Sequence, residues 1–351
     1  MIWSDLHARI HRQLKQHSLI PRSSHILIAV SGGQDSICLA QCCLDLADRW
    51  DWQLTIGHCD HRWRDDSADN AHFVANLAQT WGVPYYQRTA DSPLTNEADA
   101  RSWRYRQLIA IARHIRATHI ATGHTASDRA ETLLHHLLRG TGTDGLSSIA
   151  RSRSLHEFEI PLSPEILTPS PQLVRPLFEI FRHETATFCA DRRLPIWEDS
   201  TNRDETYTRN RIRRRLLPLL RDHFNPRIEA ALTRTADTMS IDRDCLETLA
   251  HEGLKQACDR HHNDRLHRPT LQTFHLAIQR RIVQRWLAQV FDRAPNFKHI
   301  LKVVALIEAP QKTRTDPIFG ARIVEVRGDW LVMVTLDPPR PTANPSTKRK
   351  P

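Results

Sequence analysis

One short polar stretch offers the clearest chemistry in this sequence, because it combines glycines, hydroxyls and an acid directly after a β-branched apolar run. The stretch follows the run at 25–30 and consists of Ser31, Gly32, Gly33, Gln34, Asp35 and Ser36. If a helix starts here, its first backbone N–H groups have no partner and lie at the positive end of the helix dipole. Two successive glycines let an anion approach the backbone closely. We therefore interpret these six residues as a phosphate-binding loop.

This loop differs from a Walker A motif, because it lacks both that motif's glycine spacing and its lysine. A loop without the lysine suits the α-phosphate and pyrophosphate end of a nucleotide. Asp35 cannot stabilise an anion directly, so we expect a Mg²⁺ ion between its carboxylate and the phosphates. The alternative for these residues is a tight strand-to-helix turn with serine capping.

Further polar side chains follow other strand-like runs. Asp60 and His61 stand at the end of the run 53–60, and Asp128 comes soon after the run 118–124. Ligands gather beyond the carboxyl ends of the strands in an open α/β sheet. Asp128 is therefore a candidate catalytic acid, or else an acid that only stabilises a helix N-terminus. Asp60 and His61 are candidates for ordering the adenine edge or the phosphates, with a structural His–Asp pair as the alternative.

Six arginines lie close together between residues 203 and 215 and form the clearest basic patch. They are Arg203, Arg209, Arg211, Arg213, Arg214 and Arg215. In a helix, Arg211 and Arg215 share one face, and such a face suits the phosphate backbone of a nucleic acid. A solvated basic helix without a partner is the alternative.

The elements that must position these residues are strands alternating with helices. Strand-like runs occur at 25–30, 53–60, 83–90 and 118–124, and helical patterns separate them. The helix after the last run has Ser127 as its expected N-cap and Gly140 as its stop. This alternation predicts an α/β fold, an open parallel sheet with right-handed crossovers.

The pattern changes after residue 140. Residues 140–180 read as loops with one strand-like piece at 173–180, a short helix follows at 183–193, and 207–307 is mostly helical. Two strands are expected around Arg327-Gly328-Asp329. We predict a nucleotide-binding catalytic domain over 1–220, a mostly helical domain with a terminal two-strand element over 221–337, and a disordered basic tail over 338–351.

Composition limits the classes of protein that fit. The 351 residues are 40% hydrophobic and 25% charged, which suits packed domains, and the net charge of +9 favours a polyanionic partner. No apolar run is long enough for a membrane span, and the N-terminus does not resemble a signal peptide. The seven cysteines form no CxxC motif, which argues for buried thiols in a reducing compartment and against a zinc or iron–sulfur site.

Several motifs, in order, resemble one family. The loop resembles the SGGxDS loop of the PP-loop ATP pyrophosphatase superfamily. The segments 58–64, 96–105, 121–142 and 175–218 resemble the HxDHxxR, NxEAxAR…RY, ATAHHxDDxxET and RPLL…RNxIR segments of the tRNA(Ile)-lysidine synthase family. Ser127 and Thr125 depart from this pattern, because the family often has Asp and His at those positions. The resemblance covers roughly residues 25–220; beyond 225 the chain matches only in kind, as an appended substrate domain.

The resemblance implies that C2 of a wobble cytidine is adenylated with ATP and that the ε-amine of lysine then displaces AMP. It implies Asp35, Asp128 and Arg209 as catalytic residues, with Asp35 as the Mg²⁺ ligand and Asp128 as the acid that holds the lysine amine. The ATP-binding residues would be Ser31, Gly32, Gly33, Gln34, Asp35, Ser36, Asp60, His61, Gly123 and His124. The tRNA-binding residues would be Arg203, Arg211, Arg213, Arg214 and Arg215.

The implied partners are an isoleucine tRNA with a CAU anticodon and free lysine. The protein is expected to be a monomer or homodimer. The expected location is the bacterial cytoplasm, with a plastid as the alternative. The rival functions are a PP-loop tRNA thiolase, a PP-loop amidotransferase and a tRNA-binding protein without catalysis. A thiolase needs catalytic cysteines or a cluster, whereas Cys42 and Cys43 fall inside a predicted helix and are expected to pack. An amidotransferase needs a glutaminase domain, for which no clear Cys/His unit is present.

Overall fold

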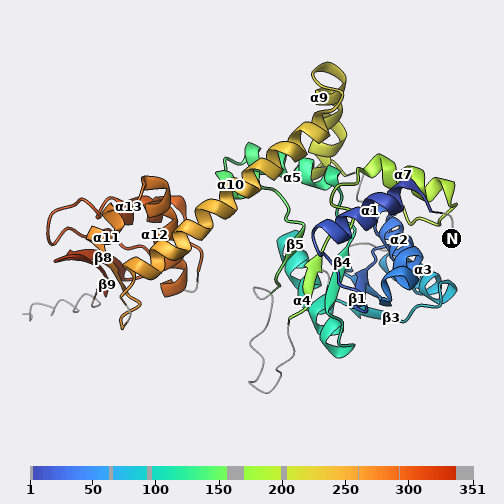
Figure 1. The fold of residues 1–351 in the computed structure, drawn as a ribbon, viewed down its shortest axis with the longest axis horizontal. Coiled ribbons are helices and arrows are strands. Elements are labelled where there is room, and N and C mark those ends of the chain that lie inside the picture. The colour runs from blue at the N-terminus through green and yellow to red at the C-terminus, as the bar shows by residue number, and fades with distance from the viewer. Residues whose placement is uncertain are drawn as a thin grey trace, which may run out of the picture. The chain divides into compact units, whose positions relative to one another are not determined.

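The computed structural model describes residues 3–62, 66–92, 97–155, 170–198, 204–259, 261–291 and 293–336 (Figure 1). The chain divides into two compact units, Met1–Ser240 and Ile241–Pro351. The division falls inside helix α10 (Ile228–Ala257), whereas the sequence places a domain boundary at residue 220. The tail expected at 338–351 lies outside the described residues.

Unit 1 contains a six-stranded sheet in the order β3-β2-β1-β4-β6-β5. Its strands are β1 (His25–Ala29), β2 (Gln53–Asp60), β3 (Tyr85–Thr89), β4 (His119–Thr122), β5 (Ser152–Arg153) and β6 (Gln172–Val174). All neighbouring pairs are parallel except β5 with β6. The predicted α/β class and parallel sheet are thus confirmed, with one short antiparallel strand at the edge. The strand expected over 173–180 is wrong beyond Val174, where the chain turns before Pro176, a residue that cannot donate to a ladder.

Helices cover both faces of this sheet because successive strand residues point to opposite sides. Ile26 and Ile28 of β1 pack into one apolar core, while Leu27 packs into another. The first core is completed by residues of the four helices α1 (Asp5–Gln16), α2 (Gln34–Trp50), α3 (Ser67–Thr80) and α7 (Arg182–Asp191). Residues of α4 (Glu97–His114) complete the second.

A further group of helices follows β4 in the sequence. They are α5 (Ala126–Leu138), α6 (Thr143–Leu146), α8 (Thr208–Arg211), a π-helical turn (Ile212–Leu216) and α9 (Leu217–His223). The N-cap of α5 is Thr125, so the expected cap at Ser127 is wrong. Thr125 is the N-cap because its hydroxyl accepts a hydrogen bond from the backbone N–H of Asp128, while the Asp128 carboxylate accepts one from the backbone N–H of Thr125. This reciprocal pair is a capping box. Gly140, at φ +72°, follows the helix end as expected.

Unit 2 is mostly helical, as the sequence indicates. A three-stranded antiparallel sheet, β7 (Arg265–His267), β9 (Trp330–Thr335) and β8 (Arg322–Arg327), packs with α11 (Arg268–Gln272), α12 (Leu276–Phe291) and α13 (Phe297–Val304). The predicted strand pair around Gly328 is present, and Trp286 is fully buried in this core. No helix among the described residues is long and apolar enough to span a membrane.

Candidate active site

The loop between β1 and α2 is held in one shape by its own hydroxyls. The Ser31 N–H donates to the Ser36 hydroxyl over 3.2 Å, and that hydroxyl donates to the Gly33 carbonyl over 2.8 Å. Gly32 has φ +89°, and a Cβ there would lie 2.6 Å from Asn70 Nδ2. Only glycine fits both the backbone conformation and the space. Helix α2 then begins at Gln34, so its first N–H groups lie at the loop as expected.

The end of β4 presses directly on this loop. A Cβ on Gly123 would lie 2.9 Å from the Asp35 carbonyl oxygen and 3.0 Å from the Ser36 nitrogen. Because no side chain separates the two segments, the residues after β4 start beside the loop. This contact brings His124 and the first turn of α5, with Asp128, to the nucleotide loop, as the sequence-based site requires.

One arginine joins three acids at this point. From the first residue of α7, Arg182 donates Nε to Asp35 Oδ2 over 3.1 Å, Nη2 to Asp128 Oδ1 over 2.7 Å and Nη1 to Glu131 Oε1 over 2.7 Å. Thr185, one turn later, donates its hydroxyl to Asp35 Oδ1 over 2.5 Å. The start of α7 therefore holds together acids that come from two different strand-to-helix junctions.

Two further arginines approach the same acids from the α8 region. Arg213 donates Nε to Glu131 Oε1 over 2.7 Å, and its Nη2 lies 3.8 Å from Asp128 Oδ1. Arg209 Nε lies 3.6 Å from Glu131 Oε2, and its Nη2 donates to Thr132. Arg213 follows Arg209 across the start of a π-helical turn, a distortion that is frequent at functional sites. Three acids and three arginines thus form one cluster.

The protonation behaviour of the two aspartates differs. Burial raises the pKa of Asp35 above its ordinary value, although Arg182 opposes this shift. Burial would also raise the pKa of Asp128, but Arg182, His124 and Arg209 lower it well below its usual range. Asp128 is therefore a stable anion, whereas Asp35 takes up a proton more readily. Such a separation is typical of functional carboxylates.

The predicted tRNA-binding arginines separate into an inner and an outer group. Arg213 points into the acid cluster, whereas Arg211 donates to the carbonyls of Glu205 and Thr206. Arg214 and Arg215 lie beside the Glu205 carboxylate. Arg211 and Arg215 share one face, as expected, and line an open hollow of about 280 Å³ with Leu138 and Leu219 among its walls. Arg203 lies outside the described residues.

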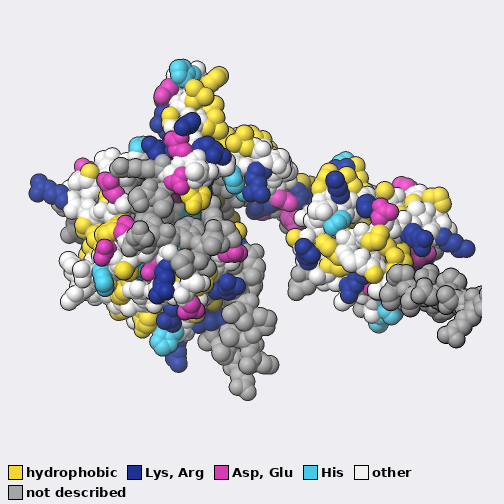
Figure 2. Space-filling view, turned by 180° about the vertical axis from the view of Figure 1, so that it is seen from behind, with side chains coloured by type: hydrophobic (Ala, Val, Ile, Leu, Met, Phe, Trp, Pro, Cys, Tyr) yellow, Lys and Arg dark blue, Asp and Glu magenta, His cyan; other side chains and the backbone are white. Residues whose placement is uncertain are grey.

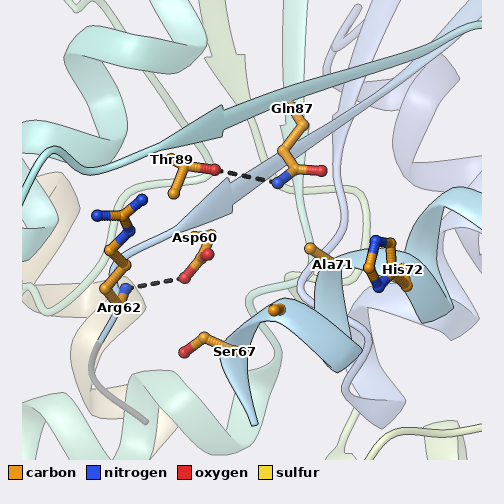
Figure 3. Close-up of a pocket in the computed structure, with 8 residues that line it drawn as sticks. Asp60, Arg62, Ser67, Ala71, His72, Gln87 and Thr89 are labelled. Carbon is orange, nitrogen blue, oxygen red and sulfur yellow. Dashed lines mark hydrogen bonds between the residues drawn. The ribbon is translucent and has the colours of Figure 1, made fainter. Parts of the chain in front are cut away.

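Asp60 and His61 lie at the carboxyl end of β2. Asp60 accepts the Arg62 backbone N–H over 2.8 Å, and His61 packs edge-on against Trp103. Burial and Arg104 lower the pKa of His61 to about 4, so its ring is neutral at physiological pH. Asp60 also lines a cavity of about 380 Å³ between α3 and the ends of β2 and β3 (Figure 3). Its other walls are Arg62, Ser67, Ala68, Ala71, His72, Gln87 and Thr89.

From the sequence no role is assigned to Arg182 or Glu131, which the structure brings into the cluster. Glu131 is fully buried and receives both Arg182 and Arg213. The only signal for Arg182 was its position in the RPLF…R segment, and contacts that span more than fifty residues cannot be seen in spacing. The expected packing of Cys42 and Cys43 inside α2 is present, since both are buried.

Comparisons with known proteins cover both parts of the chain. Residues 6–220 match a family described as the PP-loop domain, and residues 266–320 match the TilS substrate binding domain. A tRNA(Ile)-lysidine synthase from Nostoc sp. is 46% identical over 95% of this chain and 98% of the relative, and one from Thermosynechococcus vestitus is 44% identical over 97% and 95%. A chloroplastic tRNA(Ile)-lysidine synthase of Zygnema circumcarinatum is 36% identical over 84% and 78%.

The fold also resembles a solved structure of low sequence identity. The U34-tRNA thiolase NcsA from Methanococcus maripaludis, determined with its [4Fe-4S] cluster, superposes with a TM-score of 0.54 at 13% identity. The match covers 67% of this chain and 78% of the thiolase chain. At this identity the likeness concerns the fold alone.

Proposed function

This chain belongs to the tRNA(Ile)-lysidine synthase family, an ATP-dependent ligase family that forms lysidine at the wobble base of an isoleucine tRNA, and from that premise we propose how its residues divide the work. The observation that carries the proposal is the contact of Arg182 with Asp35, Asp128 and Glu131 beside the glycine loop. In this proposal Asp35 lies at the phosphate site, and Asp128 and Glu131 interact with the amine of the lysine substrate.

The glycine loop is the proposed seat of the ATP phosphates. No protein acceptor is recorded for the N–H groups of 32–35 within the described part of the chain, so four successive donors remain for an anion. Mg²⁺ usually binds through one or two carboxylates together with phosphates, and Asp35, in the first turn of α2, meets that requirement. A bound Mg²⁺ would neutralise phosphate charge there. Asp35 would be its protein ligand.

The adenosine half of ATP is assigned to the carboxyl end of β2. Asp60 and His61 lie there, next to the cavity in Figure 3. Since the His61 ring is neutral, it suits a base or a ribose better than a phosphate. Gly123 and His124 belong to the same nucleotide site through the close approach of β4 to the loop.

The lysine substrate is assigned to Asp128 and Glu131. A carboxylate has about four lone-pair sites. Thr125 donates twice to Asp128 Oδ2, so Oδ1, which accepts from Arg182, is the oxygen with capacity for the amine, and Glu131 adds negative charge beside it. Because the pKa of Asp128 is low, this carboxylate stays charged and attracts the ammonium more effectively than it removes a proton. We therefore assign Asp128 to holding the amine rather than to accepting its proton.

The proposed reaction has two steps. The C2 oxygen of the cytidine attacks the α-phosphorus of ATP and diphosphate leaves, which converts a poor leaving group into AMP. The lysine ε-amine then attacks C2, the bond from C2 to the adenylate oxygen breaks, and the amine nitrogen loses a proton as AMP departs. Arg209 and Arg213 lie where they would stabilise charge on the transferring phosphoryl group, and positioning is the main contribution of such sites.

The tRNA partner is assigned to arginines of both units. In unit 1 these are Arg211, Arg214 and Arg215, which surround Glu205. In unit 2 Arg280 lies over the ring of Phe297, a side chain that is 62% exposed, and no acid among the described residues pairs with it. Figure 2 shows basic and acidic side chains interspersed over the visible surface of each unit, so the assignment rests on individual arginines rather than on a uniformly basic surface. The proposed tRNA has a CAU anticodon. The protein is proposed to act as a monomer or homodimer, in the cytoplasm of a bacterium or in a plastid.

The direct test is to incubate the purified protein with ATP, Mg²⁺, radioactive lysine and a tRNA transcript with a CAU anticodon. We expect one lysine incorporated per AMP released and lysidine in the nucleoside digest. A transcript with a changed wobble base serves as the matched control and should remain unlabelled. ATP–pyrophosphate exchange without lysine incorporation would favour thiolation or another adenylating enzyme, and tRNA binding without exchange would favour a protein that only binds.

A further inference from the structure

A hydrogen-bonded chain links helix α10 to the start of α7. Ser127, in the first turn of α5, donates its hydroxyl to Glu229 Oε2 of α10 over 2.5 Å. The same hydroxyl accepts the backbone N–H of Arg182 over 3.1 Å. Ser127 is only 5% exposed, so water competes little for these bonds. Three segments that are far apart in sequence therefore meet at one side-chain oxygen.

The Glu229 carboxylate determines which way this hydroxyl points. A serine hydroxyl has a single proton, and a carboxylate can only accept. With its proton committed to Glu229, the Ser127 oxygen must present a lone pair elsewhere, and Arg182 N–H occupies that position. Arg221 of α9 donates to the other oxygen of Glu229 over 2.5 Å, which fixes the carboxylate from its opposite side.

The accepted N–H belongs to the residue that organises the active site. Arg182 is the first residue of α7, and the N–H of a first helical residue has no partner within its helix. Ser127 supplies that partner. The Arg182 guanidinium contacts Asp35, Asp128 and Glu131, so a shift of its backbone would move a group that touches all three acids.

We propose that Glu229 is a positioning residue of the lysidine-forming site, acting through the Ser127 hydroxyl on the backbone of Arg182. Glu229 touches none of the three acids of the cluster by any recorded contact, so its effect must pass through Ser127. This inference rests on the proposed function, because the arginine that it positions is assigned there. It gives helix α10 a part in catalysis in addition to joining the two units of the chain.

A second contact between α10 and α5 provides a matched control. Arg129, which is 3% exposed, donates to the Asp237 carboxylate and to the Thr233 carbonyl, and its guanidinium lies 3.8 Å over the Phe178 ring. Asp237 thus anchors α10 to the same helix as Glu229 does. It has no recorded contact with Ser127 or Arg182 among the described residues. A variant of Asp237 therefore weakens the anchoring of α10 without breaking the proposed chain.

The experiment compares Glu229→Ala, Glu229→Gln, Ser127→Ala, the Glu229→Ala/Ser127→Ala double variant and Asp237→Ala in steady-state lysidine formation. We expect Glu229→Ala to lower kcat by about 10- to 100-fold, the cost of misplacing a catalytic group, with the KM for tRNA changed by less than about threefold. Glu229→Gln keeps an acceptor oxygen and should restore most of kcat. The double variant should be no slower than the slower single variant, because both break one chain.

Asp237→Ala should lower the melting temperature while kcat stays near that of the wild type. The inference is overturned if Asp237→Ala lowers kcat as much as Glu229→Ala, because docking of the helix would then explain both. Additive losses in the double variant, or a Glu229→Ala enzyme with normal kcat, would also overturn it. If the wild-type protein forms no lysidine in the same assay, the proposed function fails instead, and the two failures are distinguishable.

Discussion

Arg182 is the residue on which the charge balance of the site depends. Burial would lower its pKa, but Asp128, Glu131 and Asp35 raise the pKa above the ordinary arginine value, so it stays charged. The planar guanidinium reaches three carboxylates in different directions, which a lysine ammonium of the same charge cannot reproduce. Buried acids that lose such a partner repel one another and lack compensation.

We therefore predict that Arg182→Lys retains the fold but lowers lysidine formation at least tenfold, whereas Arg182→Ala destabilises the protein by about 3–5 kcal/mol. Urea unfolding and the rate of lysine incorporation measure the two effects. Arg193, exposed just beyond the same helix, provides the control, and Arg193→Ala should leave both quantities unchanged. A fully active Arg182→Lys enzyme would contradict the three-acid role.

Asp35 gives a second prediction at this scale. Its carboxylate stands at the phosphate loop and is the proposed ligand of Mg²⁺. Asp35→Asn should abolish lysine incorporation and ATP–pyrophosphate exchange, because the amide cannot replace a carboxylate toward a divalent cation. Binding of the tRNA, followed by a filter assay, should be largely unchanged. An active Asp35→Asn enzyme would refute the assignment.

His61 connects the site to pH. Its pKa in the folded protein is about 4, below the ordinary value of 6.5, because of burial and Arg104. Between these two values the unfolded chain takes up a proton that the folded chain does not. Stability should therefore fall as the pH is lowered from about 6.5 towards about 4. In urea titrations at pH 7 and pH 5, His61→Asn should lose less stability than the wild type, and an equal loss would show that His61 does not titrate this way.

Individual site residues could be predicted where they follow a strand, and could not where the fold brings them from elsewhere. Asp35 and Asp128 were found because the position after a parallel strand is informative by itself. Arg182 and Glu229 act through contacts across fifty or more residues, which no local pattern records. The same applies to Arg213, which was expected to bind tRNA as a member of the basic cluster and which contacts Glu131 in the structure.

At the scale of elements, the contact between β4 and the glycine loop sets the spacing of the site. Gly123→Ala would place a methyl group within about 3 Å of the Asp35 backbone. We predict a loss of about 1–3 kcal/mol in stability from overpacking and a weaker affinity for ATP, because the loop must move. Calorimetric titration with an ATP analogue measures the affinity. Gly142→Ala, at a position with negative φ and without neighbours within 4 Å, controls for the general cost of replacing a glycine.

The elements themselves were largely predictable, for physical reasons that differ between them. Three of the parallel strands, β1, β2 and β4, are largely buried, and helical patterns separate the strand-like runs along the chain. The more exposed β3 was predicted from its tyrosines and its place in this alternation. The start of α5 was misplaced by two residues because Ser127 and Thr125 are both good caps, and only the tertiary contact with Glu229 decides how Ser127 is used. The π-helical turn at Ile212–Leu216 has no sequence signature that spacing could reveal.

At the scale of the whole molecule, unit 2 carries a further proposed tRNA contact, Arg280. Arg280→Ala should flatten the dependence of log affinity for tRNA on log salt concentration by about 0.7–0.9, the contribution of one phosphate contact. Arg285→Ala is the control on the same helix, because Arg285 is already paired with Glu247 at 2.6 Å. Fluorescence titrations between 50 and 200 mM salt, roughly the range over which such slopes are resolved, measure the effect. Equal slopes for Arg280→Ala and the wild type would remove Arg280 from the interface.

The domain boundary predicted at residue 220 lies where the matched PP-loop domain ends and differs from the division into compact units. A change from strand–helix alternation to helices marks residue 220, whereas the compact units divide inside α10. A continuous helix has no compositional break, so spacing cannot reveal where its contacts change partners. Which helices form the core of unit 2 could not be predicted, since helical periodicity does not say which helices pack together.

The pairing of three acids with three arginines also couples the affinities of the enzyme for lysine and for the nucleotide. If lysine binds alone, its ammonium group leaves an excess of positive charge in this largely buried cluster. If the nucleotide binds alone, its phosphates leave an excess of negative charge. When both ligands are bound, the charges of the ammonium and the phosphates compensate each other. Lysine should consequently associate more tightly with the nucleotide-loaded enzyme than with the empty one, and by thermodynamic reciprocity the nucleotide should gain the same factor from lysine.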